Sequence, residues 1–384
     1  MIRRWVLVGG GHAHLHVLRA WARRPLEGVE LVLVSPYPHH HYSGMVPGYL
    51  RGTYAESDLT VDLPALARAA GARFVPAWVE RVDGAGRMID TGGERLAFDV
   101  ASLDVGSEAA GLSLPGVAAH ALTVRPMSRA VALRAALDDR IARSPAPLTM
   151  AVVGGGAAGV EVALALERRA SDGAAGCRVR LLEGGPVILP EFGDRVRRLA
   201  RRALARRGIE VRTGARVEAV DAEGVMVGGV RLPAALVVWL AGAAAPPLLG
   251  RSTLPRDPGG FLQVDATLRA VDGTPVWGAG DCIGIAGAGN LPKAGVYAVR
   301  EAPVLHGNVR RALGDPAGAP VTYRPQRSFL ALLNTADGRA ILRWRGVALH
   351  ARAAWRLKDR IDRTFVRQYQ EPDGGMTAST HRVR

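Results

Sequence analysis

The chain has 384 residues, of which 48% are hydrophobic and 22% charged; this balance excludes wholesale disorder and leaves room for roughly two or three domains. Its net charge of +15 comes almost wholly from arginine, because Lys293 and Lys358 are the only lysines. Such a charge fits a solvated basic surface or attraction to anionic lipid. No nucleic-acid-binding module is visible, so no nucleic-acid partner is expected.

The sequence also bears on the compartment. No apolar run approaches the roughly 18 residues that span a bilayer, and the N-terminus lacks the small-residue cleavage site of a signal peptide. The two cysteines, Cys177 and Cys282, lie far apart and form no C-x-x-C motif. We therefore expect a cytoplasmic protein with neither a transmembrane segment nor a disulfide framework.

The first recognisable unit lies at the N-terminus. Apolar residues 5–8 predict a strand, Gly9–Gly11 a turn, residues 12–21 a helix and residues 29–34 a second buried strand. This order forms the βαβ unit that binds a dinucleotide at its glycine turn.

The N-terminal unit departs from the dinucleotide fingerprint at two positions. Gly9 and Gly11 fit G-x-G-x-x-G, but His14 stands at the third glycine and Ser35 replaces the acidic residue that follows the second strand. We expect His14 to pack where the helix meets the strand, and Ser35 to bond a ribose hydroxyl.

Histidines crowd this unit, since six of the ten fall within the first 41 residues. A metal site needs two or three converging imidazoles. On a helix His12 and His16 share a face while His14 points elsewhere, and residues 39–41 look like a loop. We therefore favour a histidine-rich nucleotide turn over a metal site.

The second unit is the stronger signal. Residues 149–153 predict a strand, residues 154–159 carry G-x-G-x-x-G, a helix follows to about residue 170, and residues 178–183 predict the next strand. The first glycine permits the tight turn, the second lets the backbone approach a pyrophosphate, and the third allows close helix–strand packing.

An acidic residue, Glu183, ends the second strand of this unit. Its carboxylate would accept hydrogen bonds from the adenosine ribose and repel a 2′-phosphate. No arginine follows in residues 184–186, so NADH is favoured over NADPH.

A third element lies near residue 280. Residues 273–281 predict a strand that ends in a small-residue turn with Asp281, and residues 291–300 predict a helix start with Pro292 at or before its first turn. The positive end of such a helix would face developing negative charge on a bound cofactor.

With these elements the chain resembles the FAD-dependent pyridine nucleotide-disulfide oxidoreductase superfamily, in the branch near type II NADH dehydrogenases. In particular it is similar to the flavoprotein family associated with, and often fused to, selenide, water dikinase. The segments that carry the resemblance are VLVGGGHAHLHVL (6–18), SPYPHHHYSGMVPGYLRGTY (35–54), FDVASLDVGS (98–107), AVVGGGAAGVEVALAL (151–166), VWGAGDCIGI (276–285) and LPKAGVYAVREAPVL (291–305).

The resemblance implies an α/β protein with two Rossmann-like, three-layer dinucleotide-binding domains. The FAD domain would be discontinuous, 1–115 and 250–320, with an NAD(P)H domain inserted at 116–249 and a small C-terminal α+β region at 321–384. The implied cofactor-binding residues are Gly9, Gly11, His12, Ala13, Ser35, Gly106, Gly154, Gly156, Gly159, Glu183, Gly242, Gly280, Asp281 and Lys293.

The implied reaction passes a hydride from NADH to N5 of FAD. Glu161 would contact the nicotinamide side, Pro47 belongs to a segment (42–48) like the loop beside the isoalloxazine, and Lys293 would stabilise reduced flavin. As alternatives, Glu161 is a charged helix-surface residue and Lys293 a plain surface lysine.

The electron acceptor is the open link. Disulfide reductases use a pair of cysteines at the flavin. This chain has no such pair, so we expect a quinone or similar small acceptor. The alternative is a redox-sensing or electron-delivering flavoprotein that acts with a partner protein in selenium metabolism.

The C-terminal segment carries an apolar repeat, Leu357, Ile361 and Phe365, with arginines expected on the opposite side. A basic amphipathic helix can lie on the inner face of the cell membrane and give access to quinone. It can equally bury its stripe in the core or in a homodimer interface, which we favour.

Overall fold

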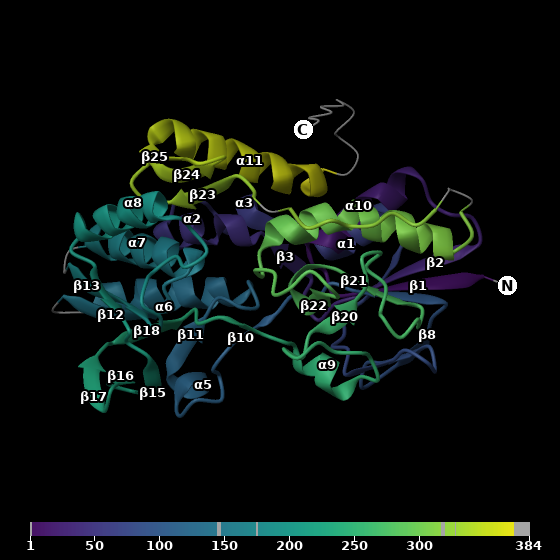
Figure 1. Cartoon of the computed structure of the whole chain (residues 1–384), viewed down its shortest axis with the longest axis horizontal. Helices are drawn as coiled ribbons and strands as arrows, with labels where there is room; N and C mark the ends of the chain where they lie inside the picture. Colours follow the sequence, from purple (N-terminus) through teal and green to yellow (C-terminus); the bar gives the residue numbers. More distant parts are fainter. Residues whose placement is uncertain (1, 144–146, 174–175, 316–318, 327, 372–384) are drawn as a thin grey trace.

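The computed structural model describes residues 2–143, 147–173, 176–315, 319–326 and 328–371. Two five-stranded parallel sheets organise the chain (Figure 1). The first sheet has the order β21 (Val276–Gly278), β9 (Val100–Leu103), β1 (Arg3–Val8), β2 (Val29–Val34), β5 (Arg73–Val75). The second has the order β11 (Ala121–Thr123), β18 (Leu236–Trp239), β12 (Leu148–Val153), β13 (Cys177–Glu183), β14 (Glu210–Thr213).

The central strands are near-continuous apolar runs, as parallel strands covered on both faces require. Helices α1 (His12–Arg23) and α10 (Gly295–Ala312) pack together beside the first sheet, and α7 (Ala157–Ser171) packs on β12 and β13 of the second. Further helices are α2 (Val46–Arg51), α3 (Glu56–Leu59), α4 (Leu63–Ala69), α5 (Val117–His120), α6 (Arg129–Arg143), α8 (Asp194–Ala205) and α9 (Pro247–Arg251).

Smaller sheets flank the parallel ones. The three-stranded antiparallel sheets are β6 (Arg81–Asp83), β7 (Met88–Asp90), β8 (Arg95–Ala97); β15 (Val217–Asp221), β16 (Gly224–Val227), β17 (Val230–Pro233); and β23 (Ala331–Asn334), β24 (Ala340–Trp344), β25 (Val347–Ala351). The two-stranded sheets are β3 (His39–His41) with β4 (Thr60–Asp62), β10 (Glu108–Ala109) with β19 (Ala243–Ala244), and β20 (Leu262–Val264) with β22 (Ile283–Ile285). Helix α11 (Arg352–Gln370) follows β25.

The C-terminal unit joins the two halves of the molecule. Its sheet contacts α7 and α8, while α11 contacts α3 and β4. In Figure 1 α11 accordingly crosses the top of the molecule.

The expected α/β class with two Rossmann-like units is confirmed. Two local predictions are wrong: residues 39–41 form strand β3 rather than a loop, and residues 42–48 form a 3-10 turn (Ser43–Met45) that runs into α2. The helix expected from about residue 291 begins at Gly295 instead, since Pro292 favours an extended residue before it and Ala294 is extended as well.

The expected faces of the C-terminal helix are also wrong. Leu357 and Ile361 are 40% and 41% exposed, and each directly follows an exposed arginine, Arg356 or Arg360, instead of being buried opposite the arginines. The buried face of α11 consists of Ala354, Lys358, Asp362, Val366 and Tyr369. Within the described ranges, none of the helices has the length and apolar character needed to cross a membrane.

Candidate functional site

A connected cavity of about 3110 Å³ lies along both parallel sheets. Typical ligand pockets measure roughly 300–1,000 Å³, so this one has room for more than one dinucleotide. The predicted site residues that line it are Gly9, Gly11, His12, Ser35, Pro47, Gly106, Gly154, Gly156, Gly159, Glu161, Glu183, Gly242, Gly280, Asp281 and Lys293. Ala13 does not line the cavity, because it is fully buried in α1.

The first glycine turn joins β1 to α1. Gly9 has a φ of +91°, and a Cβ there would stand 2.5 Å from the Asp104 carbonyl oxygen. The Gly11 N–H donates to the same oxygen at 3.1 Å. Glycine is therefore required where β1 leaves the sheet beside β9.

A buried carboxyl, which the sequence analysis missed, holds this turn. Asp104 Oδ2 accepts hydrogen bonds from the N–H groups of Ala13 at 2.7 Å and His14 at 3.1 Å, so it caps α1. Burial raises the pKa of Asp104 to about 7. The only sequence signal is its place directly after the apolar run 100–103, because the pairing of β9 with β1 is visible in the structure alone.

His14 packs between α1 and the sheet, as expected. Its ring is fully buried, with Nδ1 2.6 Å from the Gly9 carbonyl oxygen and Nε2 2.8 Å from Ser102 Oγ. Ser35 faces the cavity and its hydroxyl donates to the Tyr37 carbonyl oxygen at 2.9 Å, so its ribose contact stays a prediction. Nowhere in the described chain do three or more His, Cys, Asp or Glu side chains gather in a geometry suited to a metal ion.

The second glycine turn joins β12 to α7. Gly154 has a φ of +110°, and a Cβ on Gly159 would stand 1.7 Å from the Gly154 carbonyl oxygen. At Gly156, by contrast, a Cβ would meet no atom nearer than 4.0 Å. The backbone at Gly156 is thus open to the cavity, as a pyrophosphate-binding turn requires.

Glu183 stands at the rim of this second turn. Its Oε2 accepts from the Gly155 N–H and its Oε1 from the Gly185 N–H, both at 2.6 Å. The carboxylate therefore ties the loop after β13 to the glycine turn.

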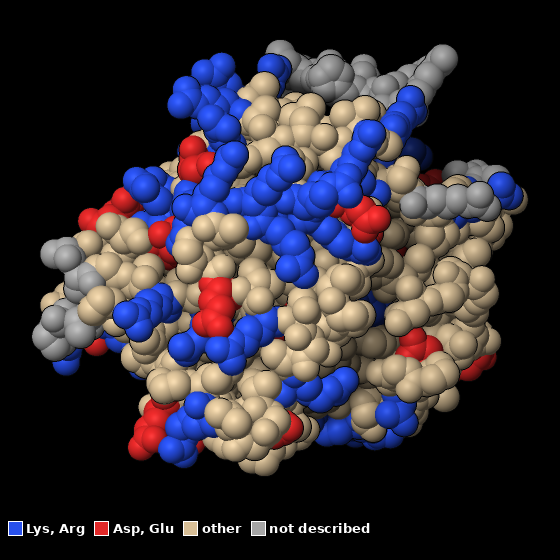
Figure 2. Space-filling view, turned by 60° about the vertical axis from the view of Figure 1, so that its left-hand side comes forward, with Lys and Arg blue, Asp and Glu red and all other residues tan. Residues whose placement is uncertain are grey.

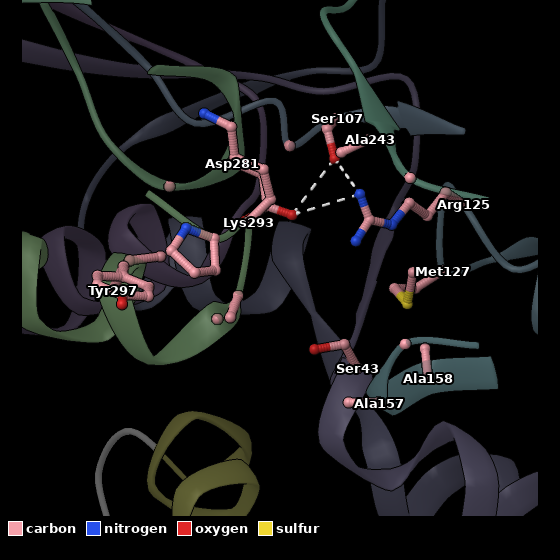
Figure 3. Close-up of a pocket in the computed structure, with 18 of the residues that line it drawn as sticks. Ser43, Ser107, Arg125, Met127, Ala157, Ala158, Ala243, Asp281, Lys293 and Tyr297 are labelled. Atoms are coloured by element: carbon pink, nitrogen blue, oxygen red, sulfur yellow. Dashed lines mark hydrogen bonds and ion pairs between the residues drawn. The ribbon is translucent and has the colours of Figure 1, made fainter. Parts of the chain in front are cut away.

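The third predicted element, around Asp281, lies across the cavity from α7 (Figure 3). Ser107 Oγ donates to Asp281 at 3.3 Å and accepts from Arg125, whose guanidinium is 3.7 Å from the same carboxylate. The buried Glu301 accepts from the Gly280 N–H at 2.6 Å, and burial raises its pKa to about 7. Sequence reasoning missed Arg125, which comes from a distant segment of the chain, and Glu301, which lies on α10 directly after this element.

Lys293 and Cys282 lie beside this element. The Lys293 ammonium donates to the Ile283 carbonyl oxygen and lies 3.8 Å from the centroid of the Phe261 ring, and burial lowers its pKa. Burial raises the pKa of Cys282 to about 12, which disfavours the reactive thiolate.

A cluster of buried charges forms another wall of the cavity. Glu161 on α7 accepts from the Asn334 N–H at 2.6 Å, and burial raises its pKa to about 7 despite the Lys358 charge. Lys358 donates to Asp362 and to the Gly44 carbonyl oxygen, both at 2.8 Å. Burial opposes the charge on Lys358, but the carboxylates of Asp362 and Glu161 outweigh it and raise the pKa. Glu161 is thus a half-buried residue of the cavity wall rather than one on the outer surface of the helix.

Aromatic rings continue this wall. Tyr42 and Phe365 have ring centroids 4.6 Å apart, and His12 lies 5.7 Å from Phe365. Pro47, in the first turn of α2, lines the cavity near them. A flat ring could stack on such a surface, close to the ionisable cluster.

Two glycine turns that face one cavity define a protein built to bring two dinucleotides together, which is the design of a nucleotide-dependent oxidoreductase. Residues 3–302 match the model of the pyridine nucleotide-disulphide oxidoreductase family. The chain belongs to this family. The expected enzyme class, an oxidoreductase that uses FAD and a pyridine nucleotide, is confirmed at that level.

Individual relatives agree with this placement. The chain is 34% identical over 298 residues to an NADH dehydrogenase-like protein of Mycobacterium tuberculosis, with 72% of each chain covered. It is 27% identical over 368 residues to the demethylphylloquinone reductase NdbB of Synechocystis, covering 91% of this chain and 89% of that one. The structure of NDH2 from Plasmodium falciparum in complex with NADH superposes with a TM-score of 0.80 at 16% identity, covering 96% and 98% of the two chains. The connection to selenide, water dikinase stays a prediction.

Proposed function

We propose that the protein is an NADH dehydrogenase that delivers electrons through FAD to a quinone or a similar small acceptor. The observation that carries the proposal is that both glycine turns and the Glu161–Lys358–Asp362 cluster open into one cavity. When bound, FAD accepts a hydride from the dihydronicotinamide ring and supplies two electrons to the acceptor. The names of the M. tuberculosis and Synechocystis relatives support this reading.

The residues present fit the two dinucleotides. The turn at Gly9 leaves no space for a side chain, Gly156 is open to the cavity, and the volume exceeds what one ligand fills. The first turn would hold the flavin nucleotide, with Asp281 and Ser107 near its ribityl chain, and the second would hold NADH. Ser35, Gly106 and Gly242 face the same cavity as further backbone or hydroxyl contacts.

Glu161 is the proposed proton donor. Reduction of a quinone by NADH consumes one proton from the protein side: NADH + H⁺ + quinone gives NAD⁺ + hydroquinone. With a pKa of about 7, the Glu161 carboxyl is partly protonated at neutral pH and can give this proton to an acceptor oxygen. Lys358 then stabilises the carboxylate that remains.

The outer face of α11 suggests how an apolar acceptor arrives. Leu357 and Ile361 line the cavity and are also exposed, and Val347 on the neighbouring strand is 53% exposed. Figure 2 shows Lys and Arg side chains in a band over this side of the molecule. The exposed arginines of α8 and α11 are Arg195, Arg198, Arg201, Arg202, Arg352, Arg356, Arg360 and Arg367. We infer peripheral attachment to an anionic membrane face.

An anaerobic titration with NADH, followed by visible flavin absorbance, tests the first half-reaction. Bleaching at stoichiometric NADH is expected, and a flavin that NADH cannot bleach contradicts the proposal. Rapid mixing of the reduced protein with a soluble quinone then tests the second half-reaction.

Glu161→Gln separates the two halves. It should keep NADH bleaching and slow reoxidation by quinone about a hundredfold, the lower end for a lost general acid. Glu167→Gln is the matched control on the same helix, because Glu167 pairs with Arg207 and does not line the cavity. Flotation with anionic but not neutral vesicles tests attachment, and no flotation with either contradicts it.

A further inference from the structure

An arginine, Arg216, lies beside Glu183 at the rim of the second glycine turn, although the two residues are far apart in the sequence. No arginine follows Glu183 in residues 184–186, but the loop between β14 and β15 brings Arg216 to the same place. Its Cα and Cβ lie 3.7 Å and 3.8 Å from where a Cβ on Gly184 would stand. Arg216 thus lies in contact with Gly184, the residue directly after β13.

Backbone hydrogen bonds fix this juxtaposition. The Ala215 N–H donates to the Glu183 carbonyl oxygen at 2.9 Å, and the Gly214 N–H donates to the Gly185 carbonyl oxygen at 2.8 Å. The two loops are therefore tied together, and these bonds between protein groups set the backbone position of Arg216.

The Arg216 guanidinium is available to a ligand. The residue is exposed, it lines the cavity beside Glu183 and Gly184, and in the described part of the chain no hydrogen bond or ion pair engages its side chain.

Glu183, which would repel a 2′-phosphate, is meanwhile engaged by the backbone. Both of its carboxylate oxygens accept backbone N–H groups, from Gly155 and Gly185. These bonds hold the negative charge on the turn side of the rim, while Arg216 supplies a positive charge on the other.

We propose that Arg216 reads the 2′-phosphate of NADPH, so that this protein oxidises NADPH as well as NADH. A guanidinium pairs with a phosphate through two parallel charge-assisted hydrogen bonds, which a ribose hydroxyl cannot match. The part that concerns oxidation rests on the proposed function, whereas recognition of the 2′-phosphate does not.

The first test is binding of 2′,5′-ADP against 5′-AMP, measured by calorimetry on the protein as purified. These ligands differ by the 2′-phosphate alone and need no flavin chemistry. The wild type should bind 2′,5′-ADP more tightly, and Arg216→Ala should remove about a tenfold preference, the lower end for charged hydrogen bonds. Arg216→Lys should keep part of it, and Arg201→Ala, an exposed arginine outside the cavity, should keep all of it.

The second test is the rate of flavin bleaching by NADPH and by NADH. Arg216→Ala should lower kcat/KM for NADPH about tenfold and leave that for NADH within about twofold. An equal loss with both nucleotides would mean that Arg216 contacts the shared adenosine, and no loss would mean that it contacts neither; both overturn the proposal. If neither nucleotide bleaches the flavin while 2′,5′-ADP binding still depends on Arg216, the proposed function fails and phosphate recognition stands.

Discussion

The two glycine turns begin with the same letters and are held in place by opposite means. At the first, the buried Asp104 caps α1 from inside, and His14 fills the space that a third glycine would leave. At the second, Glu183 holds the turn from the cavity rim, and Gly159 lets α7 approach the Gly154 carbonyl oxygen.

This difference separates a ligand that stays from one that exchanges. The shape of the first turn is fixed by two buried groups, Asp104 and His14, so it is complete before a nucleotide arrives. The second turn is tied by a half-buried carboxylate, Glu183, that the proposed pyridine nucleotide would also contact. We therefore expect the first turn to retain FAD and the second to exchange the pyridine nucleotide.

The largest expected effect is that of Asp104→Ala. It leaves the buried N–H groups of Ala13 and His14 without an acceptor, which should lower the free energy of unfolding by about 2–3 kcal/mol and release FAD. Glu183→Ala also removes two backbone acceptor bonds, but at a half-exposed site where water replaces them, so the loss should stay below about 1 kcal/mol.

Denaturant unfolding of the two variants and of the wild type, with flavin content measured in parallel, checks this pair. Equal losses of unfolding free energy in the two variants would show that the two carboxylates stabilise their turns equally, and this would contradict the distinction between the turns.

The next effect concerns the third glycine. Gly159→Ala would place a methyl group 1.7 Å from the Gly154 carbonyl oxygen, so the second turn must shift, at about 1–3 kcal/mol. The first turn lies in the other sheet and should be undisturbed. The purified variant should therefore remain yellow but no longer be bleached by stoichiometric NADH. A colourless variant would indicate that the two sites are not independent.

The sequence predicted the parts of this comparison that are local. Apolar runs, glycine spacing and the acidic residue after β13 lie within short windows, so both βαβ units and Glu183 were found. Asp104 was missed because its role depends on β9 lying next to β1, which pairs residues about ninety positions apart in the chain.

The C-terminal helix shows the other limit. Periodicity favoured Leu357, Ile361 and Phe365 as the buried stripe, whereas the structure buries Lys358 and Asp362. A lysine and an aspartate are buried only with partners: Lys358 and Asp362 pair with each other on α11, and the further partners of Lys358 lie on other elements, Glu161 on α7 and the backbone of Gly44. The hydrophobic pattern of one segment cannot reveal such a site.

The last prediction uses pH to isolate the internal cap. The pKa of Asp104 is about 7 in the folded protein against 3.8 as a free side chain, so the folded state holds a proton that the unfolded state releases. The stability from this group is complete below about pH 4 and is lost as pH rises through 7, with a slope of at most roughly 1.4 kcal/mol per pH unit.

The side chain of Asp104→Asn cannot titrate. Between pH 4 and 7 the unfolding free energy of this variant should therefore fall less steeply than that of the wild type, by up to about 1.4 kcal/mol per pH unit. Glu301→Gln should flatten it similarly, since the pKa of Glu301 is also about 7. Parallel curves for wild type and Asp104→Asn would mean that the carboxyl stays ionised and that the first turn is held by a charge rather than by a neutral acid.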